Sequence, residues 1–568
     1  MTEVSEKPYF PSTRASRRRQ AGRLAALSAG LVVAMTAAGA TTAGAATTGT
    51  TTAGAATAGA ATAGAATARP ASTPGHLLSP LALGLNTAPW DYIYAKNRSA
   101  GGGADVIQPL LKAAGVTTLR YGGGAYADYY NWQTNTDIQT CIWGNPYGSL
   151  SGAPFPYDTT APFTGASCDS PAKQLPFDLF ASQANAIGAQ KFVTVNYGSG
   201  TPAEAAAWVS HAAGSVALWE VGNENYGCWE VNNWLAQPPE NFHGYKPADS
   251  TIVNGHGKYL TCPQSVQGNA QGMSTLATSY AVNARSFMIA MKNADPAAKI
   301  GVPWDFPSSV LGSSVPDNTE WNDTVLGQDS RYIGFVDAHW YPFVFKGATG
   351  GGNPTDQQVL QSLMTIPALY GQISTELAAR DPGAKVVVGE TGVSNNLTTV
   401  ACTPAGALFA AGDALSWLAA GAQNVDWWDM NKEGSTSSPC SSPDYGMFSS
   451  SSPPVAQTPY YGYVLASKLA QPGAVLATMS TSDPADVLGY QSSLPGGHKA
   501  VAFINTGAAR TVTFSPATAL SSQLQTWTYS KGNQNAANSN IVQGTASASS
   551  LAHGISLPAQ SMVVLQSS

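Results

Sequence analysis

Residues 216–224 read VALWEVGNE, and this stretch decides the fold of the 568-residue chain. A short apolar run, typical of a buried strand, ends at a carboxylate, Glu224. The stretch 385–390, KVVVGE, repeats the arrangement and ends at Glu390. Because a buried strand has little structural use for an acid at its end, the two stretches indicate chemistry as well as fold.

Further apolar or β-branched runs end in the same way, and helix-period segments separate them. The expected strands are Leu81–Asn86, Thr117–Tyr121, Lys191–Asn196, Val216–Gly222, Lys299–Pro303, Gly334–His339, Lys385–Gly389 and Asn424–Asp429. The expected helices are Val106–Ala114, Leu175–Ile187, Pro202–Ala212, Met273–Asn293, Asp356–Ala379, Gly406–Ala420 and Pro459–Leu469. This alternation predicts an α/β chain with a (β/α)8 TIM barrel over residues 79–470. The glycine-rich segments do not match the dinucleotide-binding fingerprint, which disfavours a doubly wound sheet.

After residue 470 the helical periodicity stops, and short β-like runs follow between Gly, Asn, Ser and Pro turns. These runs are Ala474–Met479, Val487–Gln491, Ala500–Asn505, Thr511–Phe514, Leu524–Tyr529 and Met562–Leu565. Strands without intervening helices predict that residues 471–568 form a small C-terminal β-sandwich domain.

Residues 1–45 are typical of a signal peptide, because basic residues up to Arg23 precede the apolar run Leu24–Ala40 and small residues follow it. We therefore expect a secreted, extracellular protein that has no membrane contact after the signal is removed. A membrane anchor is the alternative, since the run approaches spanning length. Residues 46–78 include three TAGAA repeats and few large apolar side chains, so we expect a disordered linker.

The charge of the chain restricts its partners. Only 11% of the residues are charged and the formal net charge is −6, which disfavours nucleic acid because that partner needs a concentrated basic face. The six cysteines suit an exported chain with three disulfides, and pairing between sequence neighbours is the simplest of several possibilities: Cys141–Cys168, Cys228–Cys262 and Cys402–Cys440. The cysteines and the seven histidines show no metal-ligand spacing, so we expect no metal and no cofactor.

The two strand-end carboxylates suggest a specific reaction. The active site of a (β/α)8 barrel lies at the C-terminal ends of its strands, and the fourth and seventh strands face each other across the mouth. Glu224 closes the fourth expected strand and Glu390 the seventh. Hydrolysis of a glycoside with retention of configuration needs two carboxyl groups about 5–5.5 Å apart. The pair therefore predicts a glycosidase.

Several motifs then carry a resemblance to a known family. They are LRYGGG at 119–124, YNW at 130–132, VNYGSGTP at 195–202, WEVGNE at 219–224 and HWY at 339–341. With a glutamate closing the seventh strand, the chain resembles clan A of the retaining glycoside hydrolases and, more narrowly, the family 51 α-L-arabinofuranosidases. The resemblance implies that Glu224 is the acid/base, Glu390 the nucleophile and an oligo- or polysaccharide the substrate.

The resemblance also implies roles for residues around the pair. Arg120 should bind Glu390 and keep it ionised, or bind the buried Glu220, and both contacts can coexist. Asn223 should hold the sugar 2-hydroxyl, whose hydrogen bond strengthens in the transition state. The remaining expected substrate-binding residues are Asn196, His339, Tyr341, Trp304 and Trp428. We expect Tyr341 to hydrogen-bond Glu390, His339 to orient either Glu390 or the acid/base, and the tryptophans to stack on sugar faces.

Some features depart from the family pattern. Gly122 stands where the family has proline, and Glu390 is followed by Thr391 rather than tryptophan. The barrel is also expected to lack the amino-terminal strands that such enzymes often contribute to the β domain. Three alternatives therefore stay open: another clan A glycosidase (a xylosidase, a glucuronidase or an endo-glycanase), a transglycosidase, and a non-catalytic carbohydrate-binding protein.

Overall fold

The computed structural model describes most of the chain beyond residue 63. The described residues are 64–70, 74–91, 104–137, 175–198, 200–227, 230, 252–253, 256–257, 270–306, 319–343, 354–394, 400, 403–431, 445–449, 453–514, 520–521, 523–530, 534–535, 538–539 and 541–567. The expected signal peptide and all six cysteines lie outside these residues. Within them, no helix combines the length and the apolar character needed to cross a membrane.

The eight expected strands form a closed barrel of parallel strands. They are β3 (Leu83–Thr87), β4 (Thr118–Tyr121), β7 (Gln190–Val195), β8 (Leu218–Val221), β11 (Ile300–Trp304), β12 (Phe335–Trp340), β13 (Lys385–Thr391) and β14 (Asn424–Trp427). Each strand pairs with the next in this order, and β14 pairs with β3 to close the barrel. The predicted fold is confirmed, and every strand boundary lies within two residues of its expected position.

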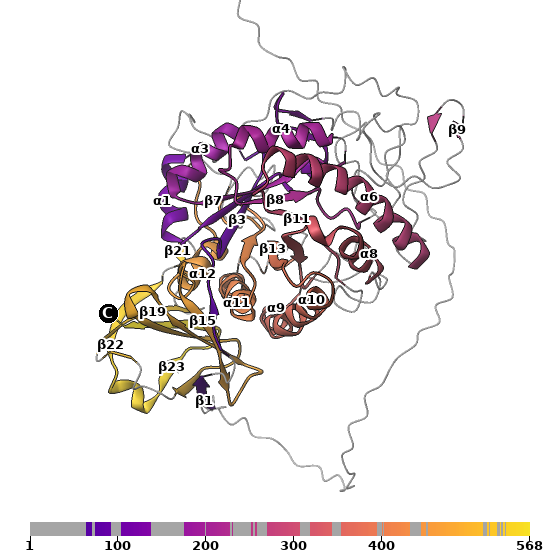
Figure 1. Cartoon of the computed structure of the whole chain (residues 1–568). Helices are drawn as coiled ribbons and strands as arrows, with labels where there is room; N and C mark the ends of the chain where they lie inside the picture. The colour runs from indigo at the N-terminus through magenta and orange to yellow at the C-terminus, as the bar shows by residue number, and fades with distance from the viewer. Residues whose placement is uncertain are drawn as a thin grey trace, which may run out of the picture. The chain divides into compact units, whose positions relative to one another are not determined.

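Helices surround the barrel (Figure 1). The described α-helices are α1 (Ala104–Ala113), α3 (Phe177–Ile187), α4 (Pro202–Ala212), α6 (Ala270–Ala294), α8 (Thr319–Asp329), α9 (Asp356–Ser362), α10 (Ile366–Arg380), α11 (Pro404–Ala420) and α12 (Thr458–Ala466). The single helix expected over 356–379 is divided by a 3₁₀ turn at Leu363–Thr365. Helix α8 was not expected, because its largely polar sequence, TEWNDTVLGQD, has no clear apolar stripe. It packs through Trp321, Val325 and Leu326, which are all buried.

The C-terminal β domain is built around one large sheet. Its strands from the C-terminal region are β15 (Val475–Thr481), β16 (Val487–Ser493), β17 (Lys499–Asn505), β18 (Arg510–Phe514), β19 (Gln523–Ser530), β22 (Val542–Ser547), β23 (Ile555–Leu557) and β24 (Ser561–Ser567). These strands pair with their neighbours antiparallel. The sheet encloses its own apolar cluster, which includes Phe503, Val512 and Leu565.

Two expectations about the region before the barrel are wrong. Strands β1 (Gly64–Pro70) and β2 (His76–Leu77) lie inside residues 46–78, which were expected to be disordered, and both join the C-terminal sheet. Strand β1 lies between β15, to which it is antiparallel, and β18, to which it is parallel. The barrel therefore does have amino-terminal strands that complete the β domain. The small side chains of Ala66 and Ala68 are buried there, and backbone hydrogen bonds on both edges supply the stability that large side chains would otherwise give.

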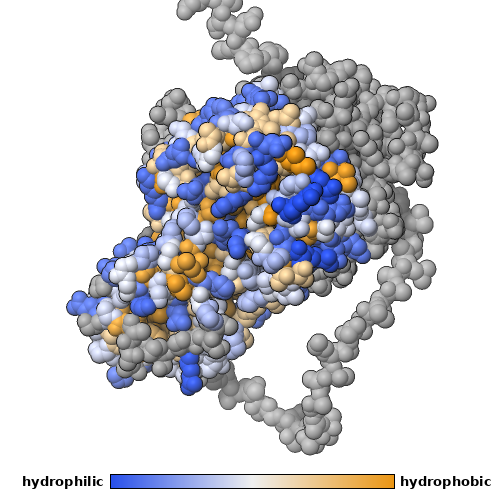
Figure 2. All heavy atoms as spheres, in the orientation of Figure 1, coloured by the Kyte–Doolittle hydropathy of each residue, from blue (hydrophilic) through white to orange (hydrophobic). Residues whose placement is uncertain are grey.

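Helix α11 joins the barrel to the β domain. All but the last of its residues are buried, and it contacts β14 of the barrel as well as β15 and β16 of the sheet. Ser416 of this helix hydrogen-bonds the hydroxyl of Tyr490 at 2.7 Å. Figure 2 shows hydrophilic and apolar residues interspersed over the surface in view, in keeping with the low charge content of the chain.

Candidate active site

The structure brings Glu224 and Glu390 together at one end of the barrel. Glu224 follows β8 and Glu390 lies near the end of β13, so they come from the fourth and seventh barrel strands. One carboxylate oxygen of each, together with Nδ1 of His339, lie within 4.8 Å of one another. Oxygens this close are compatible with the arrangement of a retaining glycosidase, in which the two carboxyl groups lie about 5–5.5 Å apart.

The backbone at Glu224 has an unusual conformation. Its φ is +44°, in the left-handed region that residues other than glycine rarely adopt, and Gly222, two residues before it, has φ +76°. Residues held in such conformations cluster at functional sites, where the surrounding structure compensates their cost. Here the turn directs the carboxylate of Glu224 toward His339 while leaving its side chain 20% exposed. Glu224 is therefore reachable from solvent.

Arg120, in β4, links the site through a fully buried guanidinium. Its Nη1 donates to Glu390 Oε1 at 2.8 Å, and its Nη2 donates to Glu220 Oε2 at 2.8 Å and to Asn223 Oδ1 at 3.0 Å. Both contacts considered from the sequence thus coexist. Negative charges around the guanidinium, led by Glu220, outweigh burial and raise the pKa of Arg120, so it stays a cation. The planar guanidinium binds several acceptors at once, and the single ammonium of a lysine could not replace it.

His339 lies between the two carboxylates. Its Nδ1 is 2.8 Å from Glu224 Oε1 and 3.6 Å from Glu390 Oε2. A register shift in the β12–β13 ladder after Asp337 sets His339 directly opposite Glu390. Burial disfavours an imidazolium, but Glu390, Asp337 and Glu224 overcome that effect and raise the pKa of His339 well above its ordinary value. His339 therefore contacts both carboxylates.

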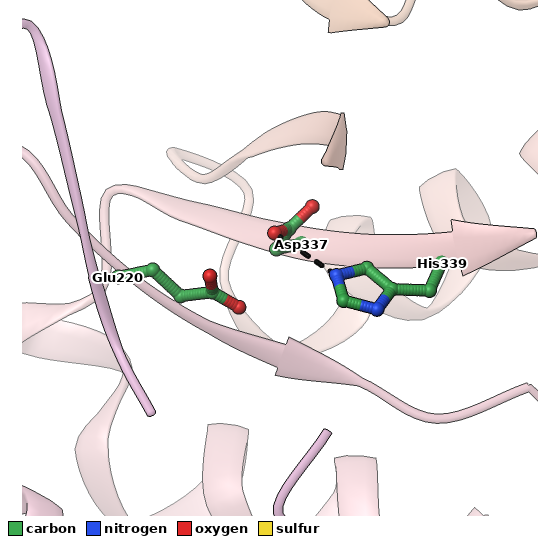
Figure 3. Close-up of side chains that lie close together, drawn as sticks. All are labelled: Glu220, Asp337 and His339. Atoms are coloured by element: carbon green, nitrogen blue, oxygen red, sulfur yellow. Dashed lines mark ion pairs between the residues drawn. The ribbon is translucent and has the colours of Figure 1, made fainter. Parts of the chain in front are cut away.

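Asp337 supports His339 from within the barrel. Its Oδ2 lies 3.4 Å from His339 Nε2, which is the ion pair drawn in Figure 3, and 3.7 Å from Arg120 Nε. Its Oδ1 accepts from the backbone N–H of Gly389 at 2.5 Å. Asp337 was not among the site residues expected from the sequence. The signal was present, because Asp337 and His339 are two positions apart on one strand and so point to the same side.

Glu390 is nearly buried and has several partners. The hydroxyl of Tyr341 donates to its Oε2 at 2.8 Å, and Arg120 binds its Oε1. Burial raises the pKa of Glu390, while the charges of His339 and Arg120 and the Tyr341 hydrogen bond oppose that rise. Arg120 thus acts in the expected direction, but it offsets the effect of burial rather than reversing it.

The two asparagines expected to bind substrate have different surroundings. Asn223 lies at the site, where its Oδ1 accepts from Arg120 and its Nδ2 donates to Glu230 Oε1 at 3.3 Å. Asn196 instead donates to the carbonyl of Tyr130 at 3.1 Å and accepts from the N–H of Gly200 at 3.0 Å. We therefore interpret Asn196 as a residue that shapes the turn between β7 and α4.

The two expected subsite tryptophans also differ. Trp304 is only 3% exposed and belongs to the hydrophobic core, so its ring offers little surface to a sugar. Trp428 is partly exposed and precedes a cis peptide bond to Asp429. A Cβ placed on Gly124 would lie 2.9 Å from the Trp428 ring and 3.6 Å from Glu390 Oε1. Gly124 therefore makes room for Trp428 beside Glu390.

Two groups among the described residues have the spacing of metal ligands: Glu220, Asp337 and His339, and Glu224, His339 and Glu390. In both groups the carboxylates already bind Arg120 or His339. Protein cations thus balance their charge, and we assign no metal to either group.

Comparisons with known proteins place this fold among carbohydrate-active enzymes. No protein-family model matches the chain, and no curated protein does either. Solved structures do match, at low identity. A family 51 α-L-arabinofuranosidase from Bifidobacterium longum shares 15% identity with a TM-score of 0.60, and the α-L-arabinofuranosidase from Thermotoga maritima in an arabinose complex shares 16% with a TM-score of 0.58. A family 44 xyloglucanase from Paenibacillus polymyxa shares 13% with a TM-score of 0.53. Each match covers 88% of this chain and 99% of the other.

These matches extend over both the barrel and the β domain. The chain therefore has the fold of the clan A glycoside hydrolases, a TIM barrel with an additional β domain. At this level of identity the likeness defines the fold, and the activity must be argued from the site itself.

Proposed function

We propose that this protein is a retaining glycoside hydrolase in which Glu390 is the nucleophile and Glu224 the acid/base. The observation that carries the proposal is the approach of the two carboxylates to within 4.8 Å around His339 Nδ1. Their different surroundings support the division of roles. Glu390 is nearly buried and held by Arg120 and Tyr341, while Glu224 keeps a fifth of its side chain open to solvent.

In the first step, Glu390 Oε attacks the anomeric carbon as the bond to the leaving oxygen breaks, and Glu224 gives that oxygen its proton. A covalent glycosyl–Glu390 ester results. In the second step, Glu224 removes a proton from water as the water oxygen attacks the same carbon and releases Glu390. Two inversions give a product with the configuration of the substrate.

The contacts around the pair suit both steps. Arg120 and Tyr341 hold Glu390 at both oxygens, which fixes its direction of attack. Esterification of Glu390 removes one negative charge close to Glu224, and this change favours the ionised form of Glu224 that the second step requires. His339 contacts both residues, so it can hold them in place while their charges change.

Among possible substrates, we propose an α-L-arabinofuranoside on a plant or cell-wall polysaccharide, cleaved outside the cell. The sequence motifs around Arg120 and Glu224 support this choice, as does the fold shared with family 51 enzymes. The basic and apolar N-terminal segment supports secretion.

A panel of nitrophenyl glycosides tests the proposal. We expect nitrophenol release from the α-L-arabinofuranoside, with less or none from the β-xyloside, glucuronide and galactofuranoside. Release from one of the others alone would keep the mechanism and change the sugar. If the purified full-length protein releases nothing from these substrates, nor from arabinan, xylan or arabinogalactan, the proposed activity is wrong. Binding of those polysaccharides without turnover would then indicate a carbohydrate-binding protein.

A further inference from the structure

Glu230 is a third carboxyl close to the catalytic pair, and sequence analysis gave it no role. Its side chain is fully buried. Its Oε1 accepts a hydrogen bond from Asn223 Nδ2 at 3.3 Å, and its Oε2 has no hydrogen-bond partner in the part of the chain that the structure describes. Acidic residues are rarely buried in this way without a reason, because desolvation of the carboxyl group costs free energy.

The backbone after β8 brings Glu230 to this place. The N–H of Gly227 donates to the carbonyl of Glu224 at 2.7 Å, and the N–H of Glu230 donates to the carbonyl of Gly227 at 3.2 Å. Together with these two backbone bonds, Glu230 contacts Asn223, seven residues earlier. The contact is therefore part of the same turn that positions Glu224.

Asn223 is held at both ends of its amide. Because a guanidinium can only donate, the contact with Arg120 requires that Oδ1 of Asn223 faces Arg120. Nδ2 then faces Glu230 and donates one of its two hydrogens to it. Asn223 is only 2% exposed, but one N–H needs less open surface than a stacked ring, and we assign its second N–H to the sugar hydroxyl expected of this residue. Glu230 thus supplies the second of two contacts that fix the amide plane.

The charge state of Glu230 fits this role. Burial, followed by the negative charges of Asp128 and Glu224, raises the pKa of Glu230 well above its usual range. A protonated carboxyl still accepts a hydrogen bond at its carbonyl oxygen. It does so without adding another negative charge beside Glu224 and Glu390, which must change their own charges during the reaction.

We propose that Glu230 is a positioning residue for glycoside hydrolysis, holding the amide of Asn223 in the orientation that binds the sugar 2-hydroxyl. Glu230 acts through Asn223 and does not touch the substrate. The inference rests on the proposed glycosidase activity. It adds that the rate also depends on Glu230, which is neither of the two reacting carboxylates.

Two single variants test it with the nitrophenyl glycoside that the wild type cleaves best. Glu230→Met has similar size but no acceptor, and we expect kcat to fall about tenfold while KM changes less than about twofold. The loss falls on kcat because the bond to the 2-hydroxyl strengthens in the transition state. Glu230→Gln keeps a carbonyl acceptor and no charge, so it should restore kcat to within about threefold of the wild type.

A double-mutant cycle with Asn223→Ala separates positioning from a general structural effect. In the Asn223→Ala background, Glu230→Met should leave kcat within about twofold, because the amide that it positions is absent. A further tenfold loss in that background, or a Gln variant as slow as the Met variant, would overturn the inference. So would an unchanged kcat for Glu230→Met in an active enzyme. If the wild type cleaves no glycoside at all, the proposed function fails and this inference with it, which is a distinct result.

Discussion

Arg120 Nη1 and Glu390 Oε1 lie 2.8 Å apart, although 270 residues separate them in the chain. The same guanidinium also binds Glu220 and Asn223, so one side chain connects Glu390 to the turn that carries Glu224. The relative position of the two carboxylates to which we assign the reaction therefore depends on Arg120.

Replacing Arg120 by lysine should show this dependence. A single ammonium cannot reach three acceptors in different directions, so at least one charge-assisted hydrogen bond is lost, each worth about 1.5–3 kcal/mol. We expect kcat/KM of Arg120→Lys to fall about 100-fold. Arg120→Met should also lower the free energy of unfolding by about 3–5 kcal/mol, because it leaves buried carboxylates without a counter-charge. Steady-state kinetics and urea unfolding measure the two effects. A lysine variant with wild-type kcat/KM would show that the simultaneous contacts of Arg120 with these acceptors are not needed.

His339 gives a prediction about pH and stability. Because surrounding carboxylates raise the folded-state pKa of His339, its protonation stabilises the folded protein. That contribution is fully present below the ordinary histidine value of about 6.5 and is lost as the pH rises through the higher folded-state value. The Tm difference between wild type and His339→Gln should therefore be larger at pH 5.5 than at pH 9.5, and kcat/KM of the variant should fall about 10- to 100-fold. An equal Tm difference at both pH values would contradict the assigned charge.

Gly124 and Gly188 form a matched pair for testing the space beside Glu390. Both have positive φ, +62° and +77°, but a Cβ on Gly188 meets nothing within 4 Å, while one on Gly124 meets the Trp428 ring at 2.9 Å. Alanine at either position should cost about 1 kcal/mol of stability through backbone strain. Only Gly124→Ala should lower kcat/KM, by about tenfold or more, as the ring is displaced. Equal activities of the two variants would exclude a role for Trp428 at the site.

Asp413, in the middle of α11, has Thr391 and Trp417 beside its carboxyl, and its replacement by asparagine should stabilise the protein. It is fully buried, and neither of its oxygens makes a hydrogen bond of normal geometry within the described residues. Burial raises its pKa well above the usual value, so its ionisation opposes folding as the pH rises above about 4. Asp413→Asn should raise Tm more at pH 8 than at pH 4, with a free-energy gain of up to about 1.4 kcal/mol per pH unit in that range. A gain that does not change with pH would show that the carboxyl ionises freely in the folded protein.

The barrel could be predicted from the sequence because its strands are short apolar runs that end at polar residues. The run before Glu224 is an example, since burial on both faces favours apolar residues at most positions of the strand, and its one acid, Glu220, pairs with Arg120. Helix α8 and strand β1 were missed for the opposite reason. Their sequences lack a clear hydrophobic periodicity. Their stability comes from neighbours elsewhere in the chain, such as β15 and β18 beside β1.

Some residues of the candidate site could likewise be predicted from the sequence, and others could not. Glu224, Glu390, Arg120, His339 and Tyr341 lie at or beside strand ends, where the barrel geometry and the family resemblance both point. The local turns that bring Glu230 against Asn223, and the bonds that hold Asn196 in its own loop, depend on backbone geometry beyond the strand pattern. The sequence does not predict the burial of Trp304 either, because a tryptophan at a strand end suits both the core and a substrate subsite.

The proposed mechanism has Glu390 attack the sugar and Glu224 exchange the proton. Azide with activated nitrophenyl glycosides tests it most directly, using Glu390→Ala and Glu224→Ala as a matched pair. Azide can enter the space left by either carboxylate. In Glu390→Ala it attacks the substrate itself and gives the inverted glycosyl azide, whereas in Glu224→Ala it attacks the glycosyl–enzyme and gives the retained one. We predict these two opposite anomers by NMR, with Glu390→Ala inactive in the absence of azide. Wild-type turnover by Glu390→Ala, or the same azide anomer from both variants, would contradict the account.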